Sequence, residues 1–196
     1  MYRNVIKRLL DILLGLCGFP FFILSFIIIA PLIKMIDNGP VFYCAKRLGK
    51  NGKIFNMYKY RSMQVNAPDI RNKDGSTYNS EDDPRVTKIG KLLRKTSLDE
   101  IPQVINVIVG DMSVVGPRPN LPGPSFNELP QIEQDRMKVR PGITGYNQAY
   151  YRNSAKTDEK YVHDTYYVEH MSFLLDVKIL LKTIVSVIRR ENIYSN

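Results

Sequence analysis

The chain has 196 residues, which is enough for one domain with a hydrophobic core and too few for two full-sized domains. Lys and Arg number 28 against 19 Asp and Glu, so the formal net charge is +9 and favours an anionic partner, whether nucleic acid, anionic lipid or a phosphate-bearing substrate. Two cysteines and two histidines exclude a disulfide scaffold, a zinc cluster and an H-E-x-x-H metalloprotease.

The N-terminal segment 12–33 is apolar and contains no charged residue, and Asp11 and Lys34 stand at its two ends. Its 22 residues form roughly 33 Å of helix at about 1.5 Å per residue, which is enough to cross the hydrocarbon core of a bilayer. A secretory signal peptide is the alternative, because basic residues precede the segment, but the segment is long for one and no small-residue cleavage site follows it. We therefore predict a membrane helix.

Pro20 lies well inside this segment and predicts a kink, because proline removes a backbone donor and clashes with the preceding turn. Basic residues stand on both sides: Arg3, Lys7 and Arg8 before the segment, and Lys34, Lys46 and Arg47 after it. Basic flanks tend to stay on the cytoplasmic side, so we predict that residues 1–36 form a re-entrant membrane helical hairpin broken near Pro20. A straight span remains the alternative.

Residues 37–196 are predicted to form one cytoplasmic domain that begins with a β-hairpin. Two short β-prone segments, 41–44 and 54–60, flank an Asn51-Gly52 pair, which is typical of a hairpin turn. The polar stretch 64–82 that follows lacks apolar periodicity and predicts a long loop.

Three helices are expected in the remainder of the chain. Asp83-Pro84 has the residue types of an N-cap and a first helical position, which predicts a helix over 83–95, and a second helix is expected over 99–110 with Gly110 after its end. Residues 173–190 show an apolar arc opposite a basic face, so this amphipathic helix either packs on the core or lies in the membrane interface. The expected fold class is α+β, mainly α with a small β-hairpin.

Asp99 and Glu100 stand side by side where one predicted helix ends and the next begins, after a basic run that includes Arg94. The helix N-terminus and the nearby cations are expected to keep both carboxylates ionised. Helix capping is the alternative role, with Asp99 as an N-cap or Ser97 and Glu100 as a capping box.

Other polar residues could also carry chemistry. Lys59 and Arg61 end the second predicted strand, and Arg118 stands between two prolines, a rigid setting that suits bidentate phosphate recognition; an exposed arginine on a turn is the alternative. The carboxylates at 81–83 could hold a metal bound to a nucleotide diphosphate, although a cap before Pro84 is favoured. The tyrosines of 146–167 pack in the core, stack on a base or lie at a membrane interface.

Several motifs occur in a fixed order along nearly the whole chain. They are M-Y-R-N-V-I-K-R-L-L-D at 1–11, N-G-P-V-F at 38–42, N-G-K-I-F-N-M-Y-K-Y-R-S-M at 51–63, K-L-L-R-K-T-S-L-D-E-I-P-Q at 91–103, G-D-M-S-V-V-G-P-R-P at 110–119 and R-P-G-I-T-G at 140–145. In order and spacing they resemble the bacterial sugar transferases, the small monotopic polyprenyl-phosphate phosphoglycosyl transferases that initiate glycoconjugate synthesis.

The resemblance implies that a sugar 1-phosphate passes from a UDP-sugar to a polyprenyl (undecaprenyl) phosphate and that UMP is released, as the first membrane step of glycan assembly. It implies that Asp99 attacks the β-phosphorus and carries a covalent phosphosugar. Asp99 and Glu100 are implied to hold Mg²⁺, or Glu100 to manage the proton of the acceptor. The residues implied to bind substrate are Lys59, Arg61, Arg94, Arg118, Arg140 and Gln148.

The resemblance also implies a place at the cytoplasmic face of the inner membrane, with a re-entrant helix broken at Pro20. Nucleic acid is not an expected partner, and the oligomeric state stays open, with a homodimer among the options. The run 146–151 differs from the smaller, glycine-containing run of relatives, so donor specificity is expected to differ there. Since the sequence ends at Asn196, we expect no additional transmembrane domain. A non-catalytic basic membrane protein that binds anionic lipid or nucleic acid remains the alternative.

Overall fold

The computed structural model describes residues 1–71, 78, 80, 82–151 and 157–189. After a π-turn at Tyr2–Ile6, the helices and strands are α1 (Lys7–Asp37), β1 (Phe42–Leu48), β2 (Ile54–Tyr60), α2 (Lys88–Thr96), α3 (Gln103–Val109), β3 (Ser113–Val115), α4 (Gln131–Arg136), β4 (Gly142–Thr144), α5 (Tyr146–Tyr150), α6 (Thr157–Glu169) and α7 (Phe173–Ile188). Helices dominate and one antiparallel hairpin is present, which confirms the predicted α+β class.

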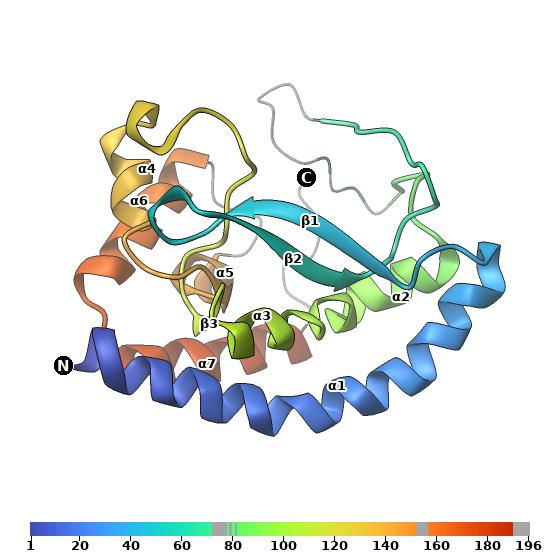
Figure 1. Ribbon diagram of the computed structural model, residues 1–196, viewed down its shortest axis with the longest axis horizontal. Helices are drawn as coiled ribbons and strands as arrows, with labels where there is room; N and C mark the ends of the chain where they lie inside the picture. The colour runs from blue at the N-terminus through green and yellow to red at the C-terminus, as the bar shows by residue number, and fades with distance from the viewer. Residues whose placement is uncertain (72–77, 79, 81, 152–156, 190–196) are drawn as a thin grey trace.

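Strands β1 and β2 form the predicted hairpin, with Phe42 opposite Tyr60 at its open end. Its turn contains Asn51 at φ 55° and Gly52 at φ 75°, left-handed conformations that asparagine and glycine tolerate best. A Cβ atom on Gly52 would also lie only 2.7 Å from the Cβ of Phe126. In Figure 1 the hairpin lies above α3, and α1 runs along the lower edge of the molecule.

Helix α1 is long and apolar enough to cross a membrane, and most of its apolar side chains are exposed. It continues through Pro20 and Pro31 as one helix, and Figure 1 shows it as a ribbon that bends in its middle part. The break predicted near Pro20 is therefore a bend within a continuous helix, because a proline removes only one donor and the turns on either side remain helical.

The C-terminal half of α1 packs on the hairpin through aromatic side chains. Phe22 and Phe26 lie against Phe42 and Tyr60, with ring centroids between 5.5 and 6.4 Å apart. Phe22 and Tyr60 belong to a buried cluster that also contains Ile29, Ile33, Leu93 and Val104. This cluster joins α1 to β2, α2 and α3, so the membrane helix and the domain share a core.

Polar contacts hold the N-terminal end of α1. Lys7 Nζ lies 2.6 Å from the carboxylate of Asp176 on α7, and both side chains are buried. Arg8 donates to two backbone carbonyls at the end of α3, and the Asp11 carboxylate accepts a hydrogen bond from Ser113 Oγ at 2.9 Å. Figure 1 shows α7 beside this half of α1. The N-terminal end of α1 is thus attached to α3, β3 and α7 by buried polar contacts.

Helix α2 begins after Thr87, which is its N-cap, and this start is later than predicted. The expected N-cap, Asp83, pairs instead with Arg85 at 2.7 Å, and Val86 forms a β-bridge with Met63. The prediction of a helix from residue 83 is wrong because this ion pair and this bridge hold residues 83–86 outside the helix.

The other two predicted helices are confirmed, with small differences. Gly110 follows the end of α3 at φ 104°, and α7 covers most of the predicted C-terminal helix, although residue 190 lies outside the described residues. A parallel pair between β3 and β4, with Ser113 opposite Gly142, was not predicted. Strands of three residues are too short to show a periodic pattern.

Candidate active site

Asp99 and Glu100 lie in a 3₁₀ turn, Leu98–Glu100, between α2 and α3. Ser97 bends the chain into this turn at φ 58°, and its side chain makes no capping hydrogen bond, so the alternative capping box is not formed. The side chain of Asp99 is only 11% exposed and that of Glu100 24%. The two carboxylates therefore face the interior of a site and do not serve as exposed caps.

Lys59 of β2 contacts both carboxylates. Its Nζ lies 2.5 Å from Glu100 Oε1 and 3.8 Å from Asp99 Oδ2. Arg118 approaches the same Glu100 oxygen at 3.9 Å, while its side chain stays 60% exposed. One ammonium group thus serves two carboxylates, and a guanidinium beside them remains open to solvent. This arrangement can accept further anionic groups.

Burial raises the pKa of the Asp99 carboxyl above its usual value, and the negative charge of Glu100 acts in the same direction. The positive charges of Lys59, Arg94 and Arg118 oppose this rise. The cations therefore act on the Asp99 pKa in the expected direction, but removal of the carboxyl from water outweighs them and leaves the pKa above its usual value. That both carboxylates are ionised stays a prediction.

Arg94 approaches the site from α2 because a glycine lets that helix lie close to the end of β2. A Cβ atom on Gly90 would come within 1.9 Å of the Ser62 carbonyl oxygen. Arg94 Nε donates to Ser62 Oγ at 3.0 Å, and its charge acts on Asp99. A larger residue at position 90 would displace α2, and Arg94 with it.

A buried network fixes the loop that carries Arg118. Arg136 of α4 donates to the backbone carbonyl of Arg118 at 2.8 Å and pairs with the buried Asp164. The same guanidinium donates to the Asn120 side chain, and the backbone N–H of Leu48, at the end of β1, donates to the Asn120 carbonyl at 2.9 Å. The backbone at Arg118 is therefore held in place while its guanidinium faces solvent.

Arg47, expected only as a basic flank of the membrane segment, lies close enough to Arg118 for the two charges to interact. It lies on β1 directly before Leu48, and burial together with the positive charge of Arg118 lowers its pKa. Within the described part of the chain, no carboxylate forms an ion pair with Arg47, whose guanidinium contacts a backbone carbonyl at 3.5 Å. The alternation of side chains along the strand could have predicted this position of Arg47. Lys59 pairs with Tyr43, and residues 43 and 47 point to the same face of the strand, so Arg47 and Lys59 lie on one face of the hairpin.

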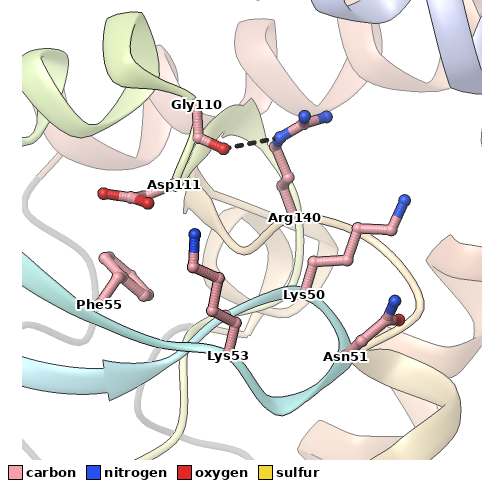
Figure 2. Close-up of a pocket in the computed structure, with 8 residues that line it drawn as sticks. Lys50, Asn51, Lys53, Phe55, Gly110, Asp111 and Arg140 are labelled. Carbon is pink, nitrogen blue, oxygen red and sulfur yellow. Dashed lines mark hydrogen bonds between the residues drawn. The ribbon is translucent and has the colours of Figure 1, made fainter.

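Two predicted substrate-binding arginines lie outside this cluster. Arg61 forms a two-point ion pair with Asp37 at the end of α1, at 2.5 and 2.7 Å. Arg140 donates from Nε to the carbonyl of Gly110 at 2.7 Å and lines a pocket at the other end of α3 (Figure 2). The structure thus gathers Lys59, Arg94 and Arg118 around the carboxylates, and it places Arg61 and Arg140 elsewhere.

Gln148, the remaining predicted substrate-binding residue, lies in α5. Both its Oε1 and its Nε2 are buried, and neither has a hydrogen-bond partner among the residues that the structure describes. A Cβ atom on Gly145 would lie 2.8 Å from Gln148 Oε1 and 2.1 Å from the Gly116 carbonyl oxygen, so this amide is next to the segment that leads into Arg118. Buried side-chain amides are normally hydrogen-bonded, which makes Gln148 a candidate ligand contact.

The tyrosines after Gly145 divide into core and surface residues. Tyr167 is fully buried, whereas Tyr150, Tyr151 and Tyr166 are 41%, 37% and 44% exposed. Tyr151 stacks on His163 with ring centroids 4.0 Å apart. The core-packing interpretation is therefore correct for Tyr167, and for the exposed rings stacking on a base stays a prediction.

The carboxylates at Asp99 and Glu100 have the chemistry that Mg²⁺ prefers when substrate phosphates and water complete its coordination. Over the described ranges, no three His, Cys, Asp or Glu side chains gather into a group able to hold a metal ion. At the alternative carboxylate run, Asp83 is paired with Arg85 and residue 81 lies outside the described residues. Two carboxylates, with Lys59 against them, could hold an ion only together with the phosphates of a substrate, so Mg²⁺ stays a prediction.

Comparison with known proteins shows relatives over the full domain. The family model for bacterial sugar transferases matches residues 2–190. The chain is 40% identical to the galactosyl transferase CpsE of Streptococcus agalactiae over 93% of its length, and 39% identical over 91% to a UDP-N-acetylgalactosamine-undecaprenyl-phosphate N-acetylgalactosaminephosphotransferase of Aeromonas hydrophila. It is 39% identical over 96% to the uncharacterized sugar transferase EpsL of Bacillus subtilis.

The relatives differ in how much of their own length the chain covers. The alignments span 42% of CpsE and 43% of the Aeromonas protein, but 90% of EpsL. The matched region includes the Asp99 turn, the Arg118 loop and most of α1 to α7. A family match over nearly the whole sequence, together with this site geometry, shows that the chain belongs to the bacterial sugar transferase family.

Proposed function

We propose that this protein transfers a sugar 1-phosphate from a UDP-sugar to a polyprenyl phosphate, releasing UMP, and so begins the assembly of a membrane-linked glycan. The observation that carries the proposal is the buried Asp99 carboxylate beside Glu100, in contact with Lys59 and close to Arg94 and Arg118. The name of the Aeromonas relative contains both a UDP-sugar and undecaprenyl phosphate, which supports these two substrates here.

The proposed reaction has two displacements at one phosphorus atom. An Asp99 oxygen attacks the β-phosphorus of the donor, the bond from that phosphorus to the bridging oxygen breaks, and UMP leaves with the electron pair. An oxygen of the lipid phosphate then attacks the same phosphorus and releases the Asp99 carboxylate. The products are UMP and a polyprenyl diphosphate sugar. A carboxylate nucleophile divides one difficult displacement into two easier ones.

The cations around Asp99 supply the electrostatic part of this mechanism. Lys59 and Arg94 lower the pKa of Asp99 against the effect of burial, which favours the nucleophilic carboxylate. Arg118, exposed on a rigid loop, and Arg47, which has no carboxylate partner among the described residues, are placed to bind the phosphates of the donor. When bound, Mg²⁺ would be held by Asp99 and Glu100 and would supply charge neutralisation of the phosphates.

Recognition of the donor beyond its phosphates is assigned to α5. The amide of Gln148, which has no hydrogen-bond partner in the described part of the chain, can donate to and accept from a sugar hydroxyl or a base. The proposed donor site therefore extends from Asp99 past the Arg118 loop to α5.

The acceptor explains why a membrane helix shares a core with the catalytic domain. We propose that α1 enters and leaves the membrane at the cytoplasmic face through its bend near Pro20, which places the Asp99 turn at the surface where the lipid phosphate lies. The exposed apolar residues of α7, including Phe173, Leu174 and Leu181, would rest in the same interface.

The reaction is tested by a screen of UDP-sugars. The full chain, reconstituted in lipid vesicles with undecaprenyl phosphate and Mg²⁺, is expected to release UMP from at least one donor. Without acceptor, the intact protein is expected to gain the mass of one phosphosugar, located on the peptide that contains Asp99. Release of no UMP and formation of no adduct with any donor, while the chain still binds polyprenyl phosphate, would favour a non-catalytic lipid-binding protein.

The membrane arrangement is tested by cysteine labelling in sealed vesicles. Cys17 and Cys44 are first replaced by serine, and single cysteines are then introduced as Arg3→Cys and Asn38→Cys. Both are expected to react from the same side as Lys88→Cys, which reports the side of the catalytic domain. Labelling of positions 3 and 38 from opposite sides would show a straight span.

A further inference from the structure

We propose that the pocket beside the β1–β2 turn is a second anion site, separate from the Asp99 site, and that Lys50, Lys53 and Arg140 bind a phosphate group there. The pocket has a volume of about 240 Å³ and is also lined by Phe55, Gly110 and Asp111. Sites that enclose drug-sized ligands are usually about 300–1,000 Å³. Its size therefore suits a phosphate or a small head group better than a whole UDP-sugar.

The charges in the pocket are unbalanced. Three cationic side chains line it against the single carboxylate of Asp111, and within the described ranges none of the three cations forms an ion pair. Figure 2 shows the carboxylate of Asp111 pointing away from Arg140 and Lys50. An uncompensated cluster of cations in a concave site attracts an anion.

Arg140 is oriented before any ligand arrives. Its Nε donates to the Gly110 carbonyl at 2.7 Å, as the dashed line in Figure 2 shows. This bond leaves the two terminal nitrogens of the guanidinium for a ligand. Figure 2 shows the ends of Arg140, Lys50 and Lys53 pointing in different directions, so the lysine side chains would turn toward a phosphate held by Arg140.

The turn that carries the two lysines is also held in place. The backbone N–H of Gly49 donates to the Lys53 carbonyl at 2.8 Å, and that of Asn51 donates to the Met137 carbonyl at 2.9 Å. The backbone from which both lysines extend is therefore fixed, and a phosphate would order only their side chains.

The pocket is distant from the proposed catalytic carboxylates. Glu100 precedes α3 and Gly110 follows it, so about ten residues of largely helical chain, roughly 15 Å, separate the two sites. Along β2, Lys59 is four residues from Phe55, which is about 13 Å of strand. A single phosphate therefore cannot contact both the pocket and the Asp99 and Glu100 carboxylates with Lys59, whereas Arg47, which pairs with Phe55 in the hairpin, is nearer to the pocket.

The pocket also lies close to the start of the membrane segment. The terminal nitrogens of Arg8 donate to the carbonyls of Val107 and Ile108, and a Cβ atom on Gly110 would lie 3.1 Å from Arg8 Nη2. The uncharged segment begins four residues later, at Ile12. The phosphate could therefore belong to an anionic lipid at the membrane surface or to a soluble molecule, and both have the chemistry that this pocket recognises.

The test compares two double variants that each remove two positive charges from exposed side chains. Lys50→Gln with Lys53→Gln changes the pocket, and Lys88→Gln with Lys91→Gln changes α2 as a matched control. Inorganic phosphate is titrated against the detergent-solubilised full chain by calorimetry, and bound phosphatidylglycerol is counted by native mass spectrometry after release from mixed phosphatidylcholine vesicles.

We expect the pocket variant to bind inorganic phosphate or phosphatidylglycerol roughly tenfold or more weakly for each charge-assisted contact that is lost, with UMP release unchanged. Loss confined to phosphatidylglycerol identifies a lipid head group, and loss of inorganic phosphate without loss of lipid identifies a soluble phosphate. Equal loss in the control variant would overturn the proposal, since diffuse charge would explain it. Loss of UMP release with unchanged phosphate binding would overturn it too, because the pocket would then belong to the donor site.

Discussion

The charges at the junction of α1 with α7 and the charges around Asp99 are neutralised in different ways. At the junction, one lysine meets one carboxylate, with Lys7 Nζ 2.6 Å from Asp176 and both side chains buried. Around Asp99, one lysine serves two carboxylates, and Arg118 is 60% exposed. At the junction each charge is neutralised by a partner within the protein, whereas near Asp99 the exposed Arg118 can still bind a substrate.

This difference predicts which substitutions affect folding and which affect catalysis. A closed pair contributes to structure, since removal of one partner leaves the other buried and uncompensated. An open group of charges can bind substrate phosphates, and its removal leaves the folded state nearly unchanged. Substitutions at the two kinds of site therefore distinguish a closed ion pair from an open group of charges.

The largest effect is expected for Asp99→Asn. Loss of the proposed nucleophile should lower UMP release by about 10³-fold or more and abolish the phosphosugar adduct. The thermal midpoint should stay equal or rise, because burial already disfavours the ionised carboxyl. UMP assays and thermal unfolding of the purified protein test both parts. The matched control is Asp69→Asn, an exposed carboxylate that pairs with Arg71, and equal loss of activity in both variants would contradict the proposal.

Asp176→Ala should instead destabilise the fold by about 3–5 kcal/mol, because Lys7 would remain buried without its partner. Tyr2 and Tyr167 would also lose a hydrogen-bond acceptor. Denaturant unfolding in detergent measures the change. The double variant Lys7→Met with Asp176→Leu should recover much of the stability, since no isolated charge is then buried. If the single variant unfolds like the unmodified protein, this pair does not hold the junction.

Arg118→Ala should weaken kcat/KM by roughly 10- to 100-fold, the range for one lost charge-assisted contact with a phosphate. Its stability should change by less than about 0.5 kcal/mol because the guanidinium is mostly exposed. Arg47→Met should act in the same direction. The control is Lys46→Met, the exposed neighbour on the same strand, which should leave UMP release unchanged. Equal activity in all three variants would remove both arginines from the donor site.

The smallest effect is expected at acid pH, at the ion pair between Arg61 and Asp37. A hydrogen bond from Arg61 lowers the pKa of Asp37 from 3.8 to about 2. Because the folded-state pKa is lower than the unfolded one, the pair stabilises the protein above about pH 4, and this stabilisation is lost as the pH falls toward about 2. Asp37→Asn should show a shallower loss of stability across that window in denaturant unfolding. Identical pH profiles would show that the pair is not coupled to folding.

Much of the architecture could be predicted because it depends on local patterns. The uncharged segment 12–33, the Asn51-Gly52 turn and the amphipathic pattern of α7 are properties of neighbouring residues, and each corresponds to the element expected. The role of Asp99 could not be predicted from a local pattern. Asp99 and its neighbours also fitted helix capping, and the catalytic interpretation came from the resemblance to a family. The start of α2 was missed because Asp83 found a partner in Arg85.

The amino-acid sequence was enough to predict a basic, membrane-associated chain of α+β class with a pair of adjacent carboxylates after a basic helix. The cations that meet those carboxylates became known from the folded structure alone. Lys59 and Arg61 are two residues apart, yet Lys59 contacts Asp99 and Glu100 while Arg61, beyond the end of β2, pairs with Asp37. The positions of Arg47 and Arg140 and the raised pKa of Asp99 also depend on the folded structure. Charge is a local property of the chain, but distance and burial depend on how β2, α2 and the Arg118 loop pack together.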